Sequence, residues 1–215
     1  MNTKNIMIIG DSYSTFKGYN PDGYNVYYHK DRTDGATVLT VEDTWWHSLS
    51  KELDLNIVLN DSWSGSTVGY RGYENADCSC TSSFIFRLER LFKNGFFEKN
   101  KIDTLFIFGA TNDSWANVEL GELKFSDFTK DDLYFVLPAV SYFIKRAKEI
   151  LPNANVIYII NDVLKPEIIN GIKSACNHFG ANYVHLSEIE KTNGHPSAIG
   201  MQKIKNQVVD FLKTL

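Results

Sequence analysis

The sequence predicts an α/β fold, built as a three-layer α/β/α sandwich around a five-stranded parallel sheet. Five short runs of mainly apolar residues indicate strands that are covered on both faces. Segments with apolar residues at helical spacing separate these runs. The expected strands cover residues 6–9, 56–60, 104–108, 156–160 and 182–185. Strands that alternate with helices favour a parallel sheet with helices on both of its faces.

The helices are expected between and after these strands, at residues 44–53, 82–93, 129–150, 165–179 and 197–212. Asp43 precedes the first helix and is expected to cap it. Pro138 lies within the third and should kink or interrupt it. Pro166 stands at the start of the fourth, where proline is favoured. Trp45 and Trp46 on the first helix are expected in the core.

Two long segments, 13–42 and 62–81, show no regular periodicity and are rich in aromatic, hydroxyl and turn residues. Irregular segments of this length in a compact domain are usually functional or disordered. The sequence contains no internal repeat and no linker-like stretch, so residues 1–215 are expected to form a single domain.

The composition favours an ordinary globular protein. Of 215 residues, 43% are hydrophobic and 22% are charged, and the net charge is −4 without a basic block, which argues against a nucleic-acid partner. Three cysteines without a disulfide or metal-binding spacing are expected to be free thiols: Cys78, Cys80 and Cys176. The apolar run 6–9 is too short for a signal peptide, and no stretch approaches the ~20 apolar residues of a membrane helix. We therefore expect no membrane partner and a cytoplasmic location, with a trimmed secreted form left open.

Unusual polar segments follow three of the predicted strands and precede the last helix. These segments are Gly10-Asp11-Ser12, Ser64-Gly65-Ser66, Gly109-Ala110-Thr111-Asn112-Asp113 and Gly194-His195. Because ligands bind at the carboxyl ends of parallel strands, all four segments should converge on one rim of the sheet.

The four segments supply the parts that acyl transfer requires: a nucleophile, a base within reach of it, and preorganised donors for an oxyanion. Ser12 stands at a strand-to-loop turn, where its hydroxyl can be exposed. His195 can take the proton of Ser12 and return it to a leaving alcohol. Gly65 can present its backbone N–H closely because it lacks a Cβ, and Asn112 offers a side-chain N–H.

The four segments resemble the four sequence blocks of the SGNH/GDSL hydrolase superfamily. These blocks are Gly-Asp-Ser near the N-terminus, an isolated Gly, Gly-x-x-Asn-Asp and a C-terminal His, and here they occur in that order over nearly the whole chain. The resemblance implies Ser12 as nucleophile, His195 as base, and an oxyanion hole from the N–H groups of Ser12 and Gly65 and the side chain of Asn112. It also implies a flavodoxin-like fold with sheet order 2-1-3-4-5, and neither a metal nor an organic cofactor.

One position departs from the family pattern. The superfamily usually carries Asp three residues before the His, whereas this chain has Thr192 there. Three alternatives remain open. Glu190 or Glu188 could supply the acid; a backbone carbonyl, or a side-chain oxygen of Thr192 or Asn193, could orient His195 in a working dyad; or the site could be degraded and slow.

Aromatic residues beside the proposed donors and nucleophile are candidates for substrate contact: Tyr13, Trp63 and Trp115. Asp11 and Asp113 are expected to be structural, holding turns through backbone hydrogen bonds.

The leading hypothesis from the sequence is a serine esterase that removes a short acyl group, such as O-acetyl, from a carbohydrate through an acyl-enzyme. The substrate would be a small-molecule or oligosaccharide ester. One alternative is a thioesterase or lysophospholipase that acts on longer acyl chains. Another is a carbohydrate-binding relative without catalysis. The sequence assigns no oligomeric state.

Overall fold

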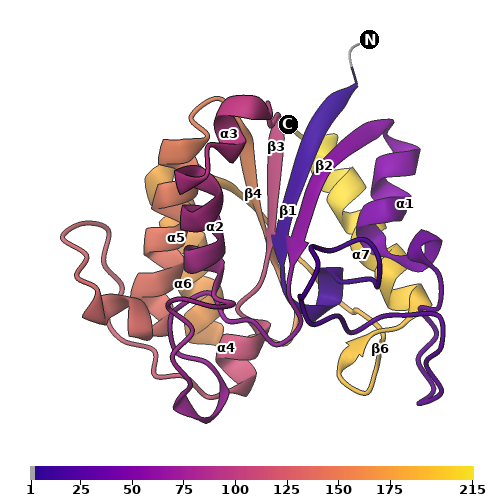
Figure 1. The fold of residues 1–215 in the computed structure, drawn as a ribbon, viewed down its shortest axis with the longest axis horizontal. Helices are drawn as coiled ribbons and strands as arrows, with labels where there is room; N and C mark the ends of the chain where they lie inside the picture. The colour runs from indigo at the N-terminus through magenta and orange to yellow at the C-terminus, as the bar shows by residue number, and fades with distance from the viewer. Residues whose placement is uncertain (1–2) are drawn as a thin grey trace.

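A computed structural model describes residues 3–215, and its centre is a five-stranded parallel sheet (Figure 1). The strand order is β2-β1-β3-β4-β5, which confirms the order that the family resemblance implies. All five predicted strands are present: β1 Lys4–Gly10, β2 Leu55–Ser62, β3 Thr104–Phe108, β4 Asn155–Ile160 and β5 Asn182–His185.

Helices cover both faces of this sheet, so the predicted three-layer sandwich is confirmed (Figure 1). One layer contains α2 (Phe84–Lys93), α5 (Val136–Ile150) and α6 (Pro166–Phe179), and the other contains α1 (Trp45–Glu52) and α7 (Ala198–Leu212). Two short helices that the sequence did not predict are α3 (Phe96–Lys99) and α4 (Thr111–Trp115).

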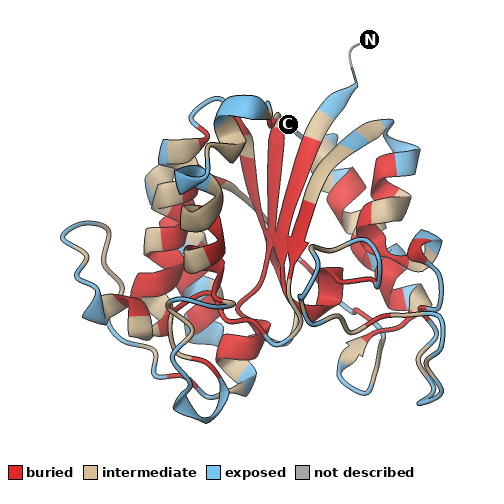
Figure 2. Cartoon of the chain, viewed as in Figure 1, coloured by how far each residue is buried: buried red, intermediate tan, exposed pale blue. Residues whose placement is uncertain are grey.

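The alternation of side chains along β1 divides the core into two hydrophobic clusters, one on each face of the sheet. Met7 and Ile9 pack in the first cluster with α2, α5 and α6, whereas Ile6 and Ile8 pack in the second with α1 and α7. Figure 2 shows the sheet buried along most of its length. Trp45 and Trp46 are buried in the second cluster, as predicted.

The start of α1 differs from the prediction. Thr44, not Asp43, caps this helix, because the Thr44 side chain accepts the backbone N–H of His47. Asp43 instead ends the preceding 3₁₀ helix η2 (Val41–Asp43), where it forms a capping box with Thr40. Two short helices in succession each need a cap, and the sequence alone did not separate them.

The predicted helix 129–150 is two elements: a 3₁₀ helix η4 (Asp131–Tyr134) and then α5, which begins at Val136. Pro138 therefore lies in the first turn of α5. The N–H groups of a first turn have no partner within the helix, so proline costs little there. Of the two outcomes predicted for Pro138, the structure shows the interruption.

A two-stranded hairpin at the end of the chain was not predicted. It consists of β6 (Lys191–Thr192) and β7 (His195–Pro196), joined by Asn193 and Gly194, both of which have positive φ angles. Asn-Gly is the preferred sequence for such a turn, so the signal was present, but the flanking strands are too short to show alternation. The hairpin lies with α4 and the loops 13–42 and 62–81 at the carboxyl edge of the sheet (Figure 1).

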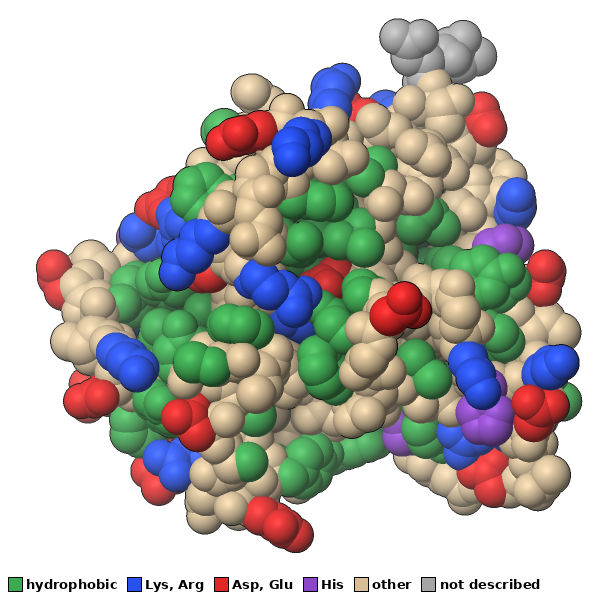
Figure 3. Space-filling view, in the orientation of Figure 1, with side chains coloured by type: hydrophobic (Ala, Val, Ile, Leu, Met, Phe, Trp, Pro, Cys, Tyr) green, Lys and Arg blue, Asp and Glu red, His purple; other side chains and the backbone are tan. Residues whose placement is uncertain are grey.

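Acidic and basic side chains are mixed over the face shown in Figure 3, with no continuous block of either sign. The three cysteines are free thiols, as predicted. Within residues 3–215, no helix combines the length and the apolar character needed to cross a membrane.

Candidate active site

Ser12 lies in a tight turn immediately after β1. It begins a 3₁₀ helix, η1 (Ser12–Ser14), that Asp11 caps by accepting the backbone N–H of Tyr13 at 3.0 Å. Gly10 is required before this turn because a Cβ there would lie 2.7 Å from Oγ of Ser62. The Ser12 side chain is thereby held at the carboxyl end of the central strands.

The structure brings His195 onto Ser12. Nε2 of His195 lies 2.9 Å from Oγ of Ser12, although the two residues are 183 positions apart in the chain. Nδ1 lies 3.2 Å from the backbone carbonyl oxygen of Asn193. A carbonyl can only accept a hydrogen bond, so this contact favours the tautomer with the proton on Nδ1. Nε2 then carries the lone pair that faces the Ser12 hydroxyl.

The candidate acids do not reach His195. The carboxylate of Glu190 accepts a 2.5 Å hydrogen bond from Oγ of Ser197, the residue that caps α7. Glu188 is exposed, and its backbone carbonyl accepts a bond from the Lys203 ammonium. Within residues 3–215, neither carboxylate is hydrogen-bonded to the imidazole. The acid role that the sequence left open for Glu190 and Glu188 is therefore not supported by this structure.

Thr192 pairs with His195 across the β6–β7 hairpin, and no hydrogen bond of the described chain joins its side-chain oxygen to the imidazole. The side chain of Asn193 is also directed elsewhere, since its Nδ2 donates to the carbonyl of Asp34 at 3.0 Å. Of the orienting groups considered from the sequence, only a backbone carbonyl lies on Nδ1.

We expect Glu190→Ala to keep kcat/KM within about threefold of the wild-type value, whereas loss of an orienting carboxylate in a serine triad costs about 10⁴-fold. The physical reason is the Glu190–Ser197 contact, which places this carboxylate on a helix cap. Ester hydrolysis by the two proteins, with Glu190→Gln as the shape-matched control, measures the effect. A loss of several hundred-fold in the alanine variant would show that Glu190 serves as a triad acid.

Asn112 lies on α4 next to the loop that contains Gly65. Its Nδ2 donates to the carbonyl of Ser66 at 2.9 Å, and its Oδ1 accepts from the hydroxyl of Tyr73 at 2.9 Å. Because the Ser66 carbonyl only accepts, these partners fix which end of the amide carries the N–H groups. Within residues 3–215, the second N–H of this amide has no hydrogen-bond partner. Gly65 has a φ of +83°, and no atom lies within 4 Å of the position that a Cβ would take.

Two buried carboxylates hold the loops of this rim together. Asp113 accepts the backbone N–H of Val68 with both oxygens, at 3.0 and 3.1 Å, and Asp11 caps the Ser12 turn. Both residues thus make the backbone hydrogen bonds that were predicted for them. Burial is the main cause that raises the pKa of Asp11 to about 7 and that of Asp113 to about 6, and the charge of Asp113 contributes to the shift of Asp11.

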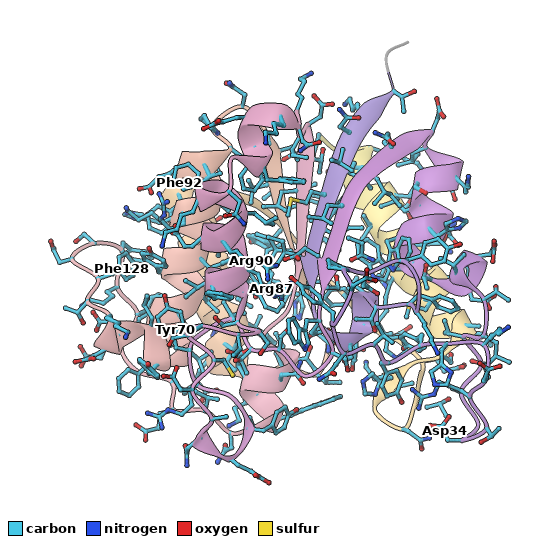
Figure 4. All side chains as sticks on the ribbon, in the orientation of Figure 1. Asp34, Tyr70, Arg87, Arg90, Phe92 and Phe128 are labelled. Atoms are coloured by element: carbon cyan, nitrogen blue, oxygen red, sulfur yellow. The ribbon has the colours of Figure 1, made fainter. Side chains whose placement is uncertain are left out.

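Arg87 on α2 also stabilises this rim. It extends from α2 toward the ends of β1 and β2 (Figure 4), where it pairs with Asp61 at 3.0 Å and donates to the carbonyl of Gly10 at 3.1 Å. Both charged side chains are fully buried. The backbone just before Ser12 is therefore anchored by a buried ion pair.

The predicted aromatic contacts lie in three different environments. The prediction that Tyr13 contacts the substrate is wrong, because Tyr13 is fully buried. Its hydroxyl donates to the carbonyl of Gly194 at 2.5 Å and so holds the hairpin. Trp63 is half-buried against the ring of Tyr24. Trp115 is 42% exposed with its ring 5.6 Å from that of His195, so it is open to a ligand.

Two aromatic residues beside His195, Tyr27 and Tyr28, were missed because they lie in the irregular 13–42 loop. The Tyr27 ring stacks on the imidazole with 3.4 Å between centroids and 8° between planes. The hydroxyl of Tyr28 donates to the carbonyl of Pro196 at 2.8 Å. No periodicity marks these positions, and only their proximity to Ser12 in the chain could have suggested a role.

Burial lowers the pKa of the His195 imidazole to about 4. The charge of Arg32 also lowers this pKa. The hydrogen bond to the Asn193 carbonyl and the charge of Asp34 act in the opposite direction. Since the neutral imidazole is the base, His195 stays competent as the pH falls until the pH approaches 4.

A cavity of about 1160 Å³ lies at the opposite, amino-terminal edge of the sheet, between residues such as Ile6, Leu55 and Val209. It contains none of the predicted site residues. Within residues 3–215, no group of three or more His, Cys, Asp or Glu side chains is arranged to hold a metal ion.

Comparisons with known proteins show the family to which the chain belongs. The sequence model of the family described as GDSL-like lipase/acylhydrolase matches residues 4–212. The chain is 38% identical to a protein described as a GDSL-like lipase from Bacteroides ovatus, with full coverage of both chains and a TM-score of 0.92. It is 36% identical to a second such protein from Bacteroides uniformis, covering 99% of this chain and 97% of the other, with a TM-score of 0.90.

More distant structures share the fold alone. An acetyl xylan esterase from the rumen bacterium Butyrivibrio proteoclasticus is 17% identical, with a TM-score of 0.63 over all of this chain and 64% of its own length. No curated protein matches the chain. Because the family model spans nearly the whole chain and two relatives exceed 30% identity over its length, the chain belongs to the GDSL-like lipase/acylhydrolase family of hydrolases.

Proposed function

We propose that this protein is a serine esterase that removes short acyl groups, O-acetyl above all, from carbohydrates. The observation that carries the proposal is the 2.9 Å contact between Oγ of Ser12 and Nε2 of His195, in an imidazole whose other nitrogen faces a carbonyl acceptor. A serine and a histidine in this relation are the minimal nucleophile and base of acyl transfer.

The reaction proceeds in two steps. Oγ of Ser12 attacks the ester carbonyl carbon while Nε2 of His195 takes the hydroxyl proton, and collapse of the tetrahedral intermediate expels the alcohol, which receives that proton. The acyl group is then an ester of Ser12. A water molecule attacks it with His195 again as base, and the carboxylic acid leaves as Ser12 regains its proton.

The negative oxygen of each tetrahedral intermediate needs donors that are already in place. We assign this role to the backbone N–H groups of Ser12 and Gly65 and to the free N–H of Asn112. Within the described chain, neither of these backbone N–H groups donates a hydrogen bond to protein. The Ser66 and Tyr73 contacts hold the Asn112 amide in one orientation.

A carbohydrate ester is supported by the surroundings of Ser12. Trp115 exposes its ring beside His195, and Trp63 and Tyr24 form a second aromatic pair. Exposed aromatic side chains can pack against the apolar faces of sugar rings. The distant fold relative that is an acetyl xylan esterase acts on an acetylated sugar polymer, which is consistent with this choice.

Turnover of p-nitrophenyl acetate, butyrate and octanoate, and acetate release from acetylated xylo-oligosaccharides, test the proposal. We expect kcat/KM to be at least about tenfold higher for the acetate than for the octanoate ester, because each group that does not fit an acyl pocket costs about 1–3 kcal/mol of transition-state binding. We also expect release of acetate from the oligosaccharide. Ser12→Ala is the control.

Activity that rises with acyl length would favour a thioesterase or lysophospholipase. Oligosaccharide binding without turnover of any ester would favour a carbohydrate-binding protein.

A further inference from the structure

Five residues form a closed circuit of contacts that includes His195. The imidazole stacks on Tyr27; the guanidinium of Arg32 lies 3.7 Å from the centre of the Tyr27 ring; and Arg32 forms an ion pair with Asp34. The carbonyl of Asp34 accepts Nδ2 of Asn193 at 3.0 Å, and the carbonyl of Asn193 lies 3.2 Å from Nδ1 of His195. We call these five residues the stacking circuit.

Tyr27 lies between two flat groups. The imidazole and the guanidinium are 3.4 and 3.7 Å from the same ring centre, so they must occupy opposite faces of it, since one face has no room for both. Arg32 also donates to the Tyr27 carbonyl at 2.5 Å. The Tyr27 backbone N–H donates at 2.8 Å to Thr15, whose hydroxyl donates to the carbonyl of Ser12 at 3.0 Å. These two hydrogen bonds connect the stacking circuit to the turn that contains Ser12.

We propose that Tyr27, braced by Arg32 and Asp34, is a positioning residue that fixes the plane of the His195 imidazole in place of the carboxylate that position 192 lacks. This inference rests on the proposed function, because it assigns a role in the same Ser12–His195 reaction. Asp34 lies at the tip of the 13–42 loop, beside the hairpin (Figure 4), so residues near the start of the chain complete a site near its end.

A triad carboxylate has two geometric tasks: it selects the tautomer and it fixes the plane of the ring. The Asn193 carbonyl performs the first task through a single 3.2 Å contact. The ring has one further polar contact in the described chain, the 2.9 Å contact of Nε2 with Ser12, and rotation about its χ2 angle has a broad energy profile. A ring stacked within 8° of parallel removes that freedom, and the edge-on ring of Trp115 limits it from another side.

Burial, more than the charges around the ring, leaves the imidazole neutral in the resting state. The titratable or charged groups that face it are Tyr13 from η1 and Tyr27, Tyr28, Arg32 and Asp34 from the loop. Arg32 and Asp34 act on its pKa in opposite directions, so burial remains the main cause of the low pKa. Removal of Tyr27 would admit water to the imidazole, and its pKa should then rise.

The test compares Tyr27→Leu with Tyr27→Phe, which keeps the stacking ring. For the leucine variant we expect kcat to fall about 10–100-fold with little change in KM, because misplacement of a catalytic group by about 1 Å costs up to about 10²-fold. The acid limb of kcat/KM should rise from about pH 4 toward the ordinary histidine value of 6.5. The phenylalanine variant should keep both the rate and the acid limb.

Phe125→Leu is the matched control, since Phe125 stacks on His178 of α6 at 4.2 Å and 10°, away from Ser12.

A second readout does not depend on ester turnover. NMR titration of ¹³C-labelled histidine, with His195 assigned from His195→Gln, should show the pKa of His195 rising in Tyr27→Leu and unchanged in Tyr27→Phe. If the wild type hydrolyses no ester, the proposed function fails, while this titration still tests whether Tyr27 covers the His195 ring. Should Tyr27→Leu not fold, Arg32→Met, which removes the guanidinium from the Tyr27 ring, should lower kcat several-fold; the rise in the His195 pKa that loss of the Arg32 charge causes by itself does not count for the inference. Equal values in wild type and Tyr27→Leu, or equal damage in the leucine and phenylalanine variants, would overturn the inference.

Discussion

Replacing Ser12 by alanine is expected to lower kcat by about 10⁴-fold or more, and replacing His195 by alanine should cost about as much, because nucleophile and base act as one unit. The 2.9 Å contact between them is the reason, since neither group can perform its step without the other. The double variant should therefore be no slower than either single variant. Residual turnover above the rate in water would come from the oxyanion donors and substrate binding.

The measurement is kcat for p-nitrophenyl acetate in the two single variants and the double variant. Thermal unfolding of each protein checks that the fold is intact. Ser14→Ala is a matched control, since Ser14 lies in the same 3₁₀ helix but contacts Trp45 and not His195. Additive losses in the double variant, or a mild loss in His195→Ala, would mean that His195 is not the base for Ser12.

The Arg87→Met substitution is expected to lower the free energy of unfolding by about 3–5 kcal/mol, the usual cost of removing one partner from a buried ion pair. Arg87 and Asp61 are both fully buried, so the substitution leaves the Asp61 carboxylate without its main partner. The guanidinium also donates to the carbonyls of Gly10 and Ser82, at 3.1 and 2.9 Å, and these acceptors would lose their donor.

Arg90→Met is the matched control, because Arg90 is on the same helix and faces the same Asp61 at 3.8 Å, with 35% of its side chain exposed. Because Arg90 is partly exposed and lies farther from Asp61 than Arg87 does, Arg90→Met should cost less than Arg87→Met. Denaturant unfolding of the two variants and the wild type gives both values. A cost in Arg87→Met no larger than that in Arg90→Met would show that the buried pair does not anchor the Ser12 turn.

The sheet could be predicted because each strand carries its own signal. The run 104–108 is apolar after Thr104, which is typical of a strand covered on both faces, and it matches β3. The convergence of Ser12 and His195 could also be predicted, because the carboxyl ends of parallel strands must meet on one rim. Local pattern and topology were sufficient for both conclusions.

The orientation of His195 could not be predicted in the same way. It depends on a backbone carbonyl of Asn193 and on the stacking face of Tyr27, and neither leaves a spacing or composition signal. For Tyr13, in contrast, the sequence predicted a substrate contact that the structure does not have. Its place after the nucleophile suggested substrate contact, but the 3₁₀ turn directs it into the core. Both misses concern side-chain direction in irregular segments, which no periodicity fixes.

The central claim is that Ser12 is a nucleophile activated by a partly buried His195 without a carboxylate. The most direct test is the rate at which a small organophosphonate labels the protein between pH 3 and 8, with the modified residue located by mass spectrometry. The account predicts one adduct, on Ser12, which forms at a constant rate above about pH 5 and falls to half near pH 4, where the imidazole takes up its proton. An adduct elsewhere, an equal rate in His195→Ala, or a half-rate at pH 6.5 or above would contradict it.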